Sequence, residues 1–379
     1  MKKILIFLAA FLMFQTACFA QTGITFLYIN GSNNNDAKMK NWYERGVKKL
    51  HPHMKREFES NKLTQEYFLK NGEYFIEQQP AIFFWGDKSH RDLAFVESDL
   101  NISKTFSPWI AYQIRFALTR FLHDAIWVQK YHNMLPVVED LHKMVVSENE
   151  KGNKVVLYGY SAGSFVTYEY MLTRLPFIET VDFFNNVDVT PAQREFVAKH
   201  PMKNTCMRAL GEDLAVFSAA GHIVPNKNDS LFKEKYMNLN NLTDQVCTPD
   251  NSLKGVVNFA SPLVLFYSDI SDPNYQITYY NRLLLEYLIE NDMFWLTVNY
   301  REDPLGFPCG RNLSIEEMEE IAKLDIEPHA GFVYDKSNTR GTRGVFMAHT
   351  SYWSTGKVFS KAVVNAYVNG YTNRKKKAE

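Results

Sequence analysis

Short apolar runs alternate with longer amphipathic segments along most of the chain. Six runs have the length and near-continuous hydrophobicity of strands covered on both faces of a sheet: residues 24–30, 81–85, 154–158, 255–259, 294–300 and 344–348. Six segments between and after them have helical character: residues 38–50, 108–128, 137–149, 164–175, 279–290 and 357–367. This alternation predicts an α/β fold with a mainly parallel sheet of about six strands and helices on both faces.

One long region breaks this alternation. Residues 176–253 are polar, irregular and rich in Asn, Asp, Thr and Pro. A structureless connection of that length is unusual inside a compact domain. We therefore expect an inserted cap or lid, partly helical around residues 191–199.

The first twenty residues have the layout of a secretory signal peptide. Two lysines precede an apolar run over residues 4–14, and a small-residue end follows at Cys18-Phe19-Ala20. The run is too short to span a bilayer, so we expect cleavage after Ala20 and an exported domain over residues 21–379, periplasmic or secreted. Anchoring through a lipid-modified Cys18 is less favoured, because residues 15–17 lack the usual apolar residue three positions upstream. No later segment predicts a transmembrane helix.

The net charge gives no reason to expect a nucleic-acid partner. Without Lys2 and Lys3 the chain keeps 40 basic and 42 acidic residues, a net charge of −2, so it has no excess of positive charge to attract phosphates.

The three cysteines after residue 20, Cys206, Cys247 and Cys309, allow one disulfide at most in an oxidising compartment. Cys206–Cys247 is a plausible pair, and either pairing with Cys309 stays open. None has metal-ligand spacing, and we expect neither metal nor cofactor.

The stretch Gly-Tyr-Ser-Ala-Gly, residues 159–163, follows an apolar strand and precedes a helical segment. A tight strand-to-helix turn holds its middle residue in strained dihedrals and projects that side chain above the sheet. Small residues two positions to either side let strand and helix pack closely. This is the context that G-x-S-x-G needs to act as a nucleophile elbow. Ser161 is therefore the candidate nucleophile; the alternative is a packing turn with an incidental serine.

A reactive serine needs donors for the oxyanion that forms on the attacked carbonyl. One candidate is the backbone N–H of Ala162, at the start of the helix. The other is the backbone N–H of Ser32, in the Asn30-Gly31-Ser32 stretch directly after the first strand. The alternative for "NGSNNND" is a plain polar turn.

The base and the acid have to be found downstream of Ser161. Four histidines follow it: His200, His222, His329 and His349. His349 ends the last predicted strand and is favoured over His329, which lies outside any strong strand. Asp303 follows the strand at 294–300 and precedes Pro304, which places it at the sheet edge where open α/β sheets build their sites. Weaker candidates for the acid are Glu302, Asp292, Asp269 and Asp272.

These motifs resemble the α/β-hydrolase superfamily over most of the mature chain. The similar stretches are "YINGSN", "GYSAGS", "VNFASPL", "WLTVNYREDPLG" and "AHTSYW". The resemblance implies a catalytic triad in the order Ser161–Asp303–His349, oxyanion donors at Ser32 and Ala162, and no cofactor. Asn30 stands where the family usually has histidine.

The resulting expectation is an exported serine hydrolase, a lipase-like carboxylesterase acting on a small-molecule or lipid ester. An amidase, peptidase or acyltransferase with the same triad and a non-catalytic binding protein stay open. We expect the helix at 108–128 to pack on the sheet rather than line an acyl pocket or lie on a membrane, and we expect His51 and His53 to be surface residues.

Overall fold

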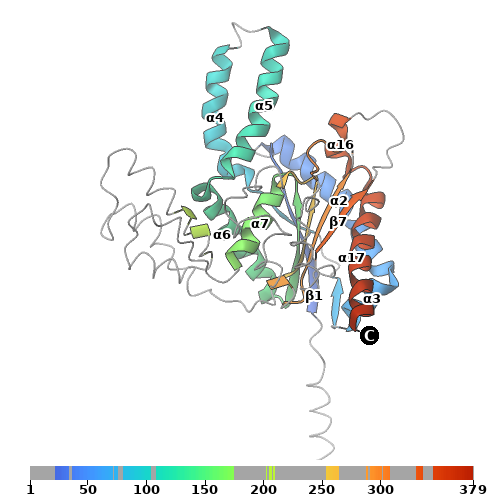
Figure 1. Cartoon of the computed structure of the whole chain (residues 1–379). Coiled ribbons are helices and arrows are strands. Elements are labelled where there is room, and N and C mark those ends of the chain that lie inside the picture. The colour runs from blue at the N-terminus through green and yellow to red at the C-terminus, as the bar shows by residue number, and fades with distance from the viewer. Residues whose placement is uncertain are drawn as a thin grey trace, which may run out of the picture.

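The structure is a computed structural model of the chain (Figure 1). It describes residues 22–33, 36–70, 72–75, 80–103, 108–174, 202, 205–206, 208–209, 253–263, 287–288, 291–300, 302–307, 330–335 and 345–378. The expected signal peptide, nearly all of the expected cap at 176–253 and most of the helix expected at 279–290 lie outside these residues.

The described strands form one sheet in which every pair is parallel. They are β1 (Thr22–Ile29), β2 (Glu73–Phe75), β3 (Ala81–Phe83), β4 (Asn153–Tyr160), β5 (Leu253–Phe259), β6 (Phe294–Tyr300) and β7 (Ala330–Asp335). Their order is β2-β1-β4-β5-β6-β7, and β3 also pairs with β1. Because β2 pairs with the start of β1 and β3 with its end, the two short strands share one position at the edge of the sheet. The predicted α/β class with a parallel sheet is confirmed.

Helices cover both faces of the sheet. On one face lie α2 (Ala37–Ser60), α3 (Lys62–Lys70) and α17 (Gly356–Ala378); on the other lie α6 (Tyr131–Glu150) and α7 (Gly163–Arg174) (Figure 1). The alternation of side chains along β4 explains the two layers. Val155 and Leu157 belong to the hydrophobic cluster with α6 and α7, whereas Val156 and Tyr158 belong to the cluster with α2 and α17. Each central strand is thus buried on both sides, which accounts for its nearly continuous apolar sequence.

The strand order reverses its direction between β1 and β4. From β1 the chain runs outward to β2 and β3, then returns past β1 to β4 and continues through β5, β6 and β7 in the opposite direction. Open α/β sheets bind ligands at such a reversal, outside the carboxyl ends of the strands. Those ends here are Ile29 and Tyr160.

The last predicted strand is wrong. Residues 344–348 were expected to be a strand, but the chain forms helix α16 (Val345–Ser351), and β7 lies earlier, at Ala330–Asp335. A run of five apolar residues has the same hydrophobicity in a buried helix turn as in a buried strand, so the pattern alone does not separate them.

The expected packing of the 108–128 helix on the sheet is also wrong for most of its length. Helix α5 (Trp109–Trp127) packs along α4 (Gly86–Ser103), and the two project from the body of the molecule (Figure 1). Side chains four residues apart form an exposed apolar ridge, 44–66% exposed: Ile110, Ile114, Leu118, Leu122 and Ile126. Only the base of α5 joins the core, where Trp127 stacks on Trp85.

The state of Cys206 and the apolar character of the helices bear on two further expectations from the sequence. Cys206 is a buried free thiol that packs in the cluster with α6 and α7, so the structure does not contain the Cys206–Cys247 disulfide; Cys247 and Cys309 lie outside the described residues. Within the described part of the chain, no helix has the length and apolar character needed to cross a membrane.

Candidate active site

Ser161 lies on the turn between β4 and α7, at the carboxyl edge of the sheet. Its φ is +52°, in the left-handed region that residues other than glycine rarely adopt. The turn is held by hydrogen bonds from the Ser161 N–H to the Phe259 carbonyl at 3.0 Å and from the Ser164 N–H to the Ser161 carbonyl at 2.9 Å. The backbone conformation of Ser161 is therefore maintained by its neighbours on β5 and α7.

The two glycines around Ser161 permit close packing of strand and helix. A Cβ at position 163 would lie 2.6 Å from the carbonyl oxygen of Ile29, and one at position 159 would lie 3.0 Å from the carbonyl oxygen of Gly163. Real Cβ atoms do not approach backbone oxygens at 2.6 Å. The local sequence is thus the one that this sharp turn requires.

Asp303 follows β6 and lies on a tight turn, with its side chain fully buried. Its Oδ1 accepts a hydrogen bond from the Leu305 N–H at 2.9 Å. Its Oδ2 accepts one from the Tyr352 hydroxyl at 3.0 Å. Burial and the negative charge of Asp303 raise the pKa of Tyr352, so that hydroxyl stays protonated and donates. The carboxylate is therefore fixed in orientation from both sides.

His349 lies on α16 and joins the other two side chains. Its Nδ1 is 3.0 Å from Oδ1 of Asp303, and its Nε2 is 3.0 Å from Oγ of Ser161. A carboxylate only accepts hydrogen bonds, so Nδ1 carries the proton and Nε2 has the lone pair that faces the serine hydroxyl. The Tyr160 hydroxyl donates to the His349 carbonyl at 3.0 Å and holds the histidine backbone. The structure thus brings Ser161, Asp303 and His349 into one hydrogen-bonded chain.

The loop after β1 lies directly against Ser161. A Cβ at Gly31 would lie 2.8 Å from the Cβ of Ser161, so the backbone of residues 30–32 reaches the serine as closely as glycine allows. Ser32 follows in this loop, and Ala162 begins the turn into α7. Both sequence-predicted donors therefore belong to segments that contact or include the Ser161 turn.

Asn30 holds this loop where the family resemblance would place a histidine. Its Oδ1 accepts from the Trp85 N–H at 2.9 Å, and its Nδ2 donates to the Gly31 carbonyl at 2.8 Å. The Trp85 indole in turn donates to the Asn30 carbonyl at 2.6 Å. An amide can donate and accept at once, so Asn30 and Trp85 fasten the loop to the end of β3.

A buried carboxylate at the base of the α4–α5 pair supports the same loop, and the sequence reading missed it. Asp124 accepts from the Asn33 N–H at 2.7 Å and from the Ser89 hydroxyl at 2.8 Å. Asn33 has φ +59°, so the loop turns sharply there. The sequence does hold a signal for it: Asp124 is an acid among apolar residues of a helix, and a buried charge needs hydrogen-bond partners.

Tyr352, which bonds to Asp303, was also not predicted from the sequence. It lies three residues after His349 in "HTSYW".

The weaker sequence candidates lie apart from this chain of hydrogen bonds or outside the described residues. Glu302 is exposed. Asp292 precedes β6, at the opposite edge of the sheet from Ser161, and pairs with Lys254 at 3.4 Å. His200, His222, His329, Asp269 and Asp272 lie outside the described residues.

Among the described residues, no group of three or more His, Cys, Asp or Glu side chains could hold a metal ion. Comparisons of the chain with protein-family models, curated proteins and solved structures found no match.

Proposed function

We propose that the protein is an exported serine hydrolase that cleaves carboxylic esters through an acyl-enzyme intermediate. The observation that carries this proposal is the hydrogen-bond chain from Asp303 through His349 to Ser161, with 3.0 Å at each link. A serine hydroxyl becomes a useful nucleophile when an adjacent base can take its proton, and a third group that orients the base completes the arrangement.

The proposed reaction begins with attack of Ser161 Oγ on the acyl carbonyl carbon. The hydroxyl proton passes to Nε2 of His349, while the proton on Nδ1 remains hydrogen-bonded to Asp303. Backbone N–H groups of Ser32 and Ala162 would stabilise the oxyanion. Collapse of the tetrahedral intermediate expels the alcohol, which takes the proton from His349. Water then attacks the acyl-enzyme with the same base, and the acid and free Ser161 are released.

We infer an α/β-hydrolase fold of about six sheet positions, with residues 176–253 as a cap inserted between β4 and β5. The chain order Ser161–Asp303–His349 and the strand–turn–helix context of Ser161 support it. Export is inferred from residues 1–20 alone.

Three alternatives use the same residues differently. An amidase or peptidase would cleave amides, an acyltransferase would pass the acyl group to an acceptor other than water, and a binding protein would not turn over at all. The binding protein is disfavoured because all three positions are occupied by residues that are hydrogen-bonded in reactive order.

A matched pair of chromogenic substrates tests the proposal. The purified full-length protein is assayed with p-nitrophenyl butyrate and with butyryl p-nitroanilide, which differ only in the scissile bond. We expect ester cleavage that falls at least about a thousandfold in Ser161→Ala and a much slower reaction with the anilide. Equal rates on both substrates would make the protein an amidase. Preferred transfer to added alcohol would make it an acyltransferase, and no turnover by the wild type would favour the binding protein.

A further inference from the structure

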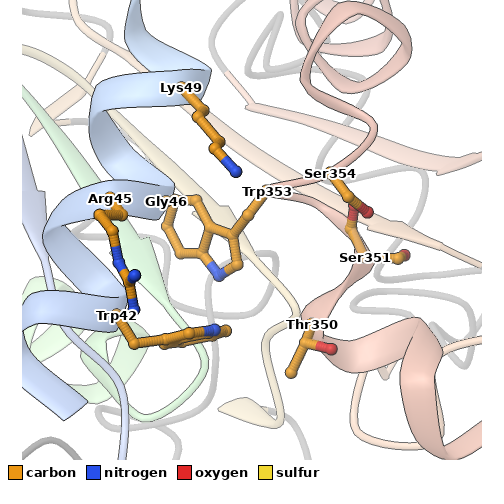
Figure 2. A pocket seen from close by; sticks show the side chains of 8 residues that line it. All are labelled: Trp42, Arg45, Gly46, Lys49, Thr350, Ser351, Trp353 and Ser354. Carbon is orange, nitrogen blue, oxygen red and sulfur yellow. The ribbon is translucent and has the colours of Figure 1, made fainter. Parts of the chain in front are cut away.

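A pocket lies between α2 and the segment that follows His349. It has a volume of about 290 Å³, at the small end of the range typical of ligand pockets. Its lining is Trp42, Arg45, Gly46, Lys49, Thr350, Ser351, Trp353 and Ser354, which excludes Ser161 and Asp303 (Figure 2). The pocket is thus distinct from the proposed catalytic residues, although Thr350 directly follows His349.

Two indoles give the pocket flat apolar walls. Trp42 and Trp353 are nearly perpendicular, at 86°, with ring centroids 6.4 Å apart. Trp353 can lie against α2 because position 46 is glycine: a Cβ there would lie 2.9 Å from Cδ2 of the indole. Its other aromatic neighbours are Tyr160, Tyr43 and Phe259, at centroid distances of 4.9, 5.3 and 5.4 Å. Walls of this kind accommodate a planar ring by stacking and edge contacts.

Two cations on α2 line the same pocket (Figure 2). Arg45 and Lys49 are one helical turn apart, and like charges at this spacing repel. Arg45 donates from Nε to the Asn41 carbonyl of its own helix, and no described carboxylate pairs with either side chain. The neighbouring Lys48, in contrast, is near Glu44 at 3.8 Å. The pocket therefore offers two positive charges that an anionic group would neutralise.

The opposite wall offers a hydrogen-bond acceptor. The hydroxyl protons of Ser351 and Ser354 are donated to the carbonyls of Ala348 and Ser351, at 2.7 and 3.0 Å. Ser351 is buried, whereas Ser354 is exposed, so the Ser354 oxygen keeps lone pairs for a ligand that donates. The complementary molecule is therefore a flat ring with an anionic group at one end and a hydroxyl or amine at the other.

We propose that this pocket binds a small aromatic carboxylate that carries a hydrogen-bond donor on its ring. The carboxylate lies against Arg45 and Lys49, and the ring packs in the corner that the two perpendicular indoles of Trp42 and Trp353 form. The proposal does not depend on catalysis by Ser161.

Isothermal titration calorimetry of the full-length protein with 4-hydroxybenzoate tests the site, with 4-hydroxybenzamide as the neutral match. We expect saturable binding of the carboxylate with one site per chain and at least tenfold weaker binding of the amide. The double variant R45Q/K49Q should weaken carboxylate binding at least tenfold. These side chains are exposed, so circular dichroism should report an intact fold.

Two control variants make the result decisive. Lys48→Gln removes a cation of the same helix that does not line the pocket, and Ser161→Ala removes the proposed nucleophile; both should bind 4-hydroxybenzoate like the wild type. Absence of saturable binding to the wild type, or equal weakening by K48Q and R45Q/K49Q, would overturn the proposal. Loss of binding in S161A would instead place the ligand at the catalytic residues and overturn it as well.

Discussion

The hydroxyl of Tyr352 donates a hydrogen bond to Oδ2 of Asp303, across 49 positions of the chain. The Tyr352 hydroxyl oxygen also accepts a hydrogen bond from the Tyr300 N–H at 2.8 Å, which ties the segment between α16 and α17 to the end of β6. The acid of the proposed triad and the segment that follows the histidine are therefore held in register by one phenol. His349 and Asp303 meet because of this contact as well as through their own hydrogen bond.

Tyr352→Phe should slow the reaction of Ser161 about tenfold. The change removes a hydrogen bond to a charged carboxylate, a contact worth about 1.5–3 kcal/mol, and leaves Asp303 freer to turn away from His349. The measurement is the rate constant for modification by a fluorophosphonate, together with the thermal midpoint. Tyr158→Phe is the control, since its buried hydroxyl has no partner among the described residues. A wild-type rate for Y352F would show that the phenol does not position Asp303.

Asp124→Ala should destabilise the protein by about 2–3 kcal/mol and also slow labelling of Ser161. The Asn33 N–H and the Ser89 hydroxyl would lose their buried acceptor, which loosens the loop that carries Ser32. Denaturant unfolding and the fluorophosphonate rate measure the two effects. Asp99→Ala changes an exposed acid on α4 and should alter neither. An unchanged labelling rate in D124A would separate Asp124 from the proposed oxyanion loop.

His51 should make stability depend on pH. The expectation that it is a surface residue holds only in part: His51 is half-buried, and its ring packs edge-on against Phe26 and near Tyr28, at centroid distances of 5.5 and 5.9 Å. Burial, with a smaller contribution from the positive charge of Lys55, lowers its pKa to about 4. The neutral form is thus favoured in the folded state.

The sign of the pH effect follows from this lowered pKa. The stabilising contribution is fully present above pH 6.5 and is lost as the pH falls toward about 4, because the unfolded chain binds the proton first. The loss should be about 2–3 kcal/mol. Free energies of unfolding of the wild type and His51→Leu, measured from pH 4 to 7.5, should converge or cross as the pH falls. Parallel pH profiles for the two proteins would contradict the assignment.

The apolar ridge on α5 should tolerate polar substitution. Ile114 and Leu118 are 55% and 51% exposed, so I114Q and L118Q should each change the free energy of unfolding by no more than about 0.5 kcal/mol. Leu141→Ala, in the buried face of α6, should cost about 2–5 kcal/mol in the same denaturant measurement. A cost above 2 kcal/mol for the ridge variants would mean that this surface is covered in solution.

The elements that could be predicted from the sequence are those whose signal is local. The strands β1, β4, β5 and β6 are nearly continuous apolar runs, and five consecutive residues specify the Ser161 turn. β2 has three residues, with exposed Tyr74 in the middle, which is too short for periodicity. α16 was taken for a strand because its apolar run is brief.

Contacts between distant segments were the hardest to predict. His349 was chosen by comparison with the other downstream histidines, and the element assigned to it was wrong, yet the structure brings it to Ser161 and Asp303. Nothing in the sequence pairs Tyr352 with Asp303, or Asp124 with Asn33. These hydrogen bonds join residues 49 and 91 positions apart, and they depend on how the layers pack.

The most direct test of the central claim is covalent labelling of the full-length protein by a fluorophosphonate, followed by intact-mass measurement and peptide mapping. We predict one label per chain, on the peptide that contains Ser161, and no labelling of Ser161→Ala. Equal modification of the wild type and S161A, or a label mapped to another residue, would contradict the claim that Ser161 is the nucleophile.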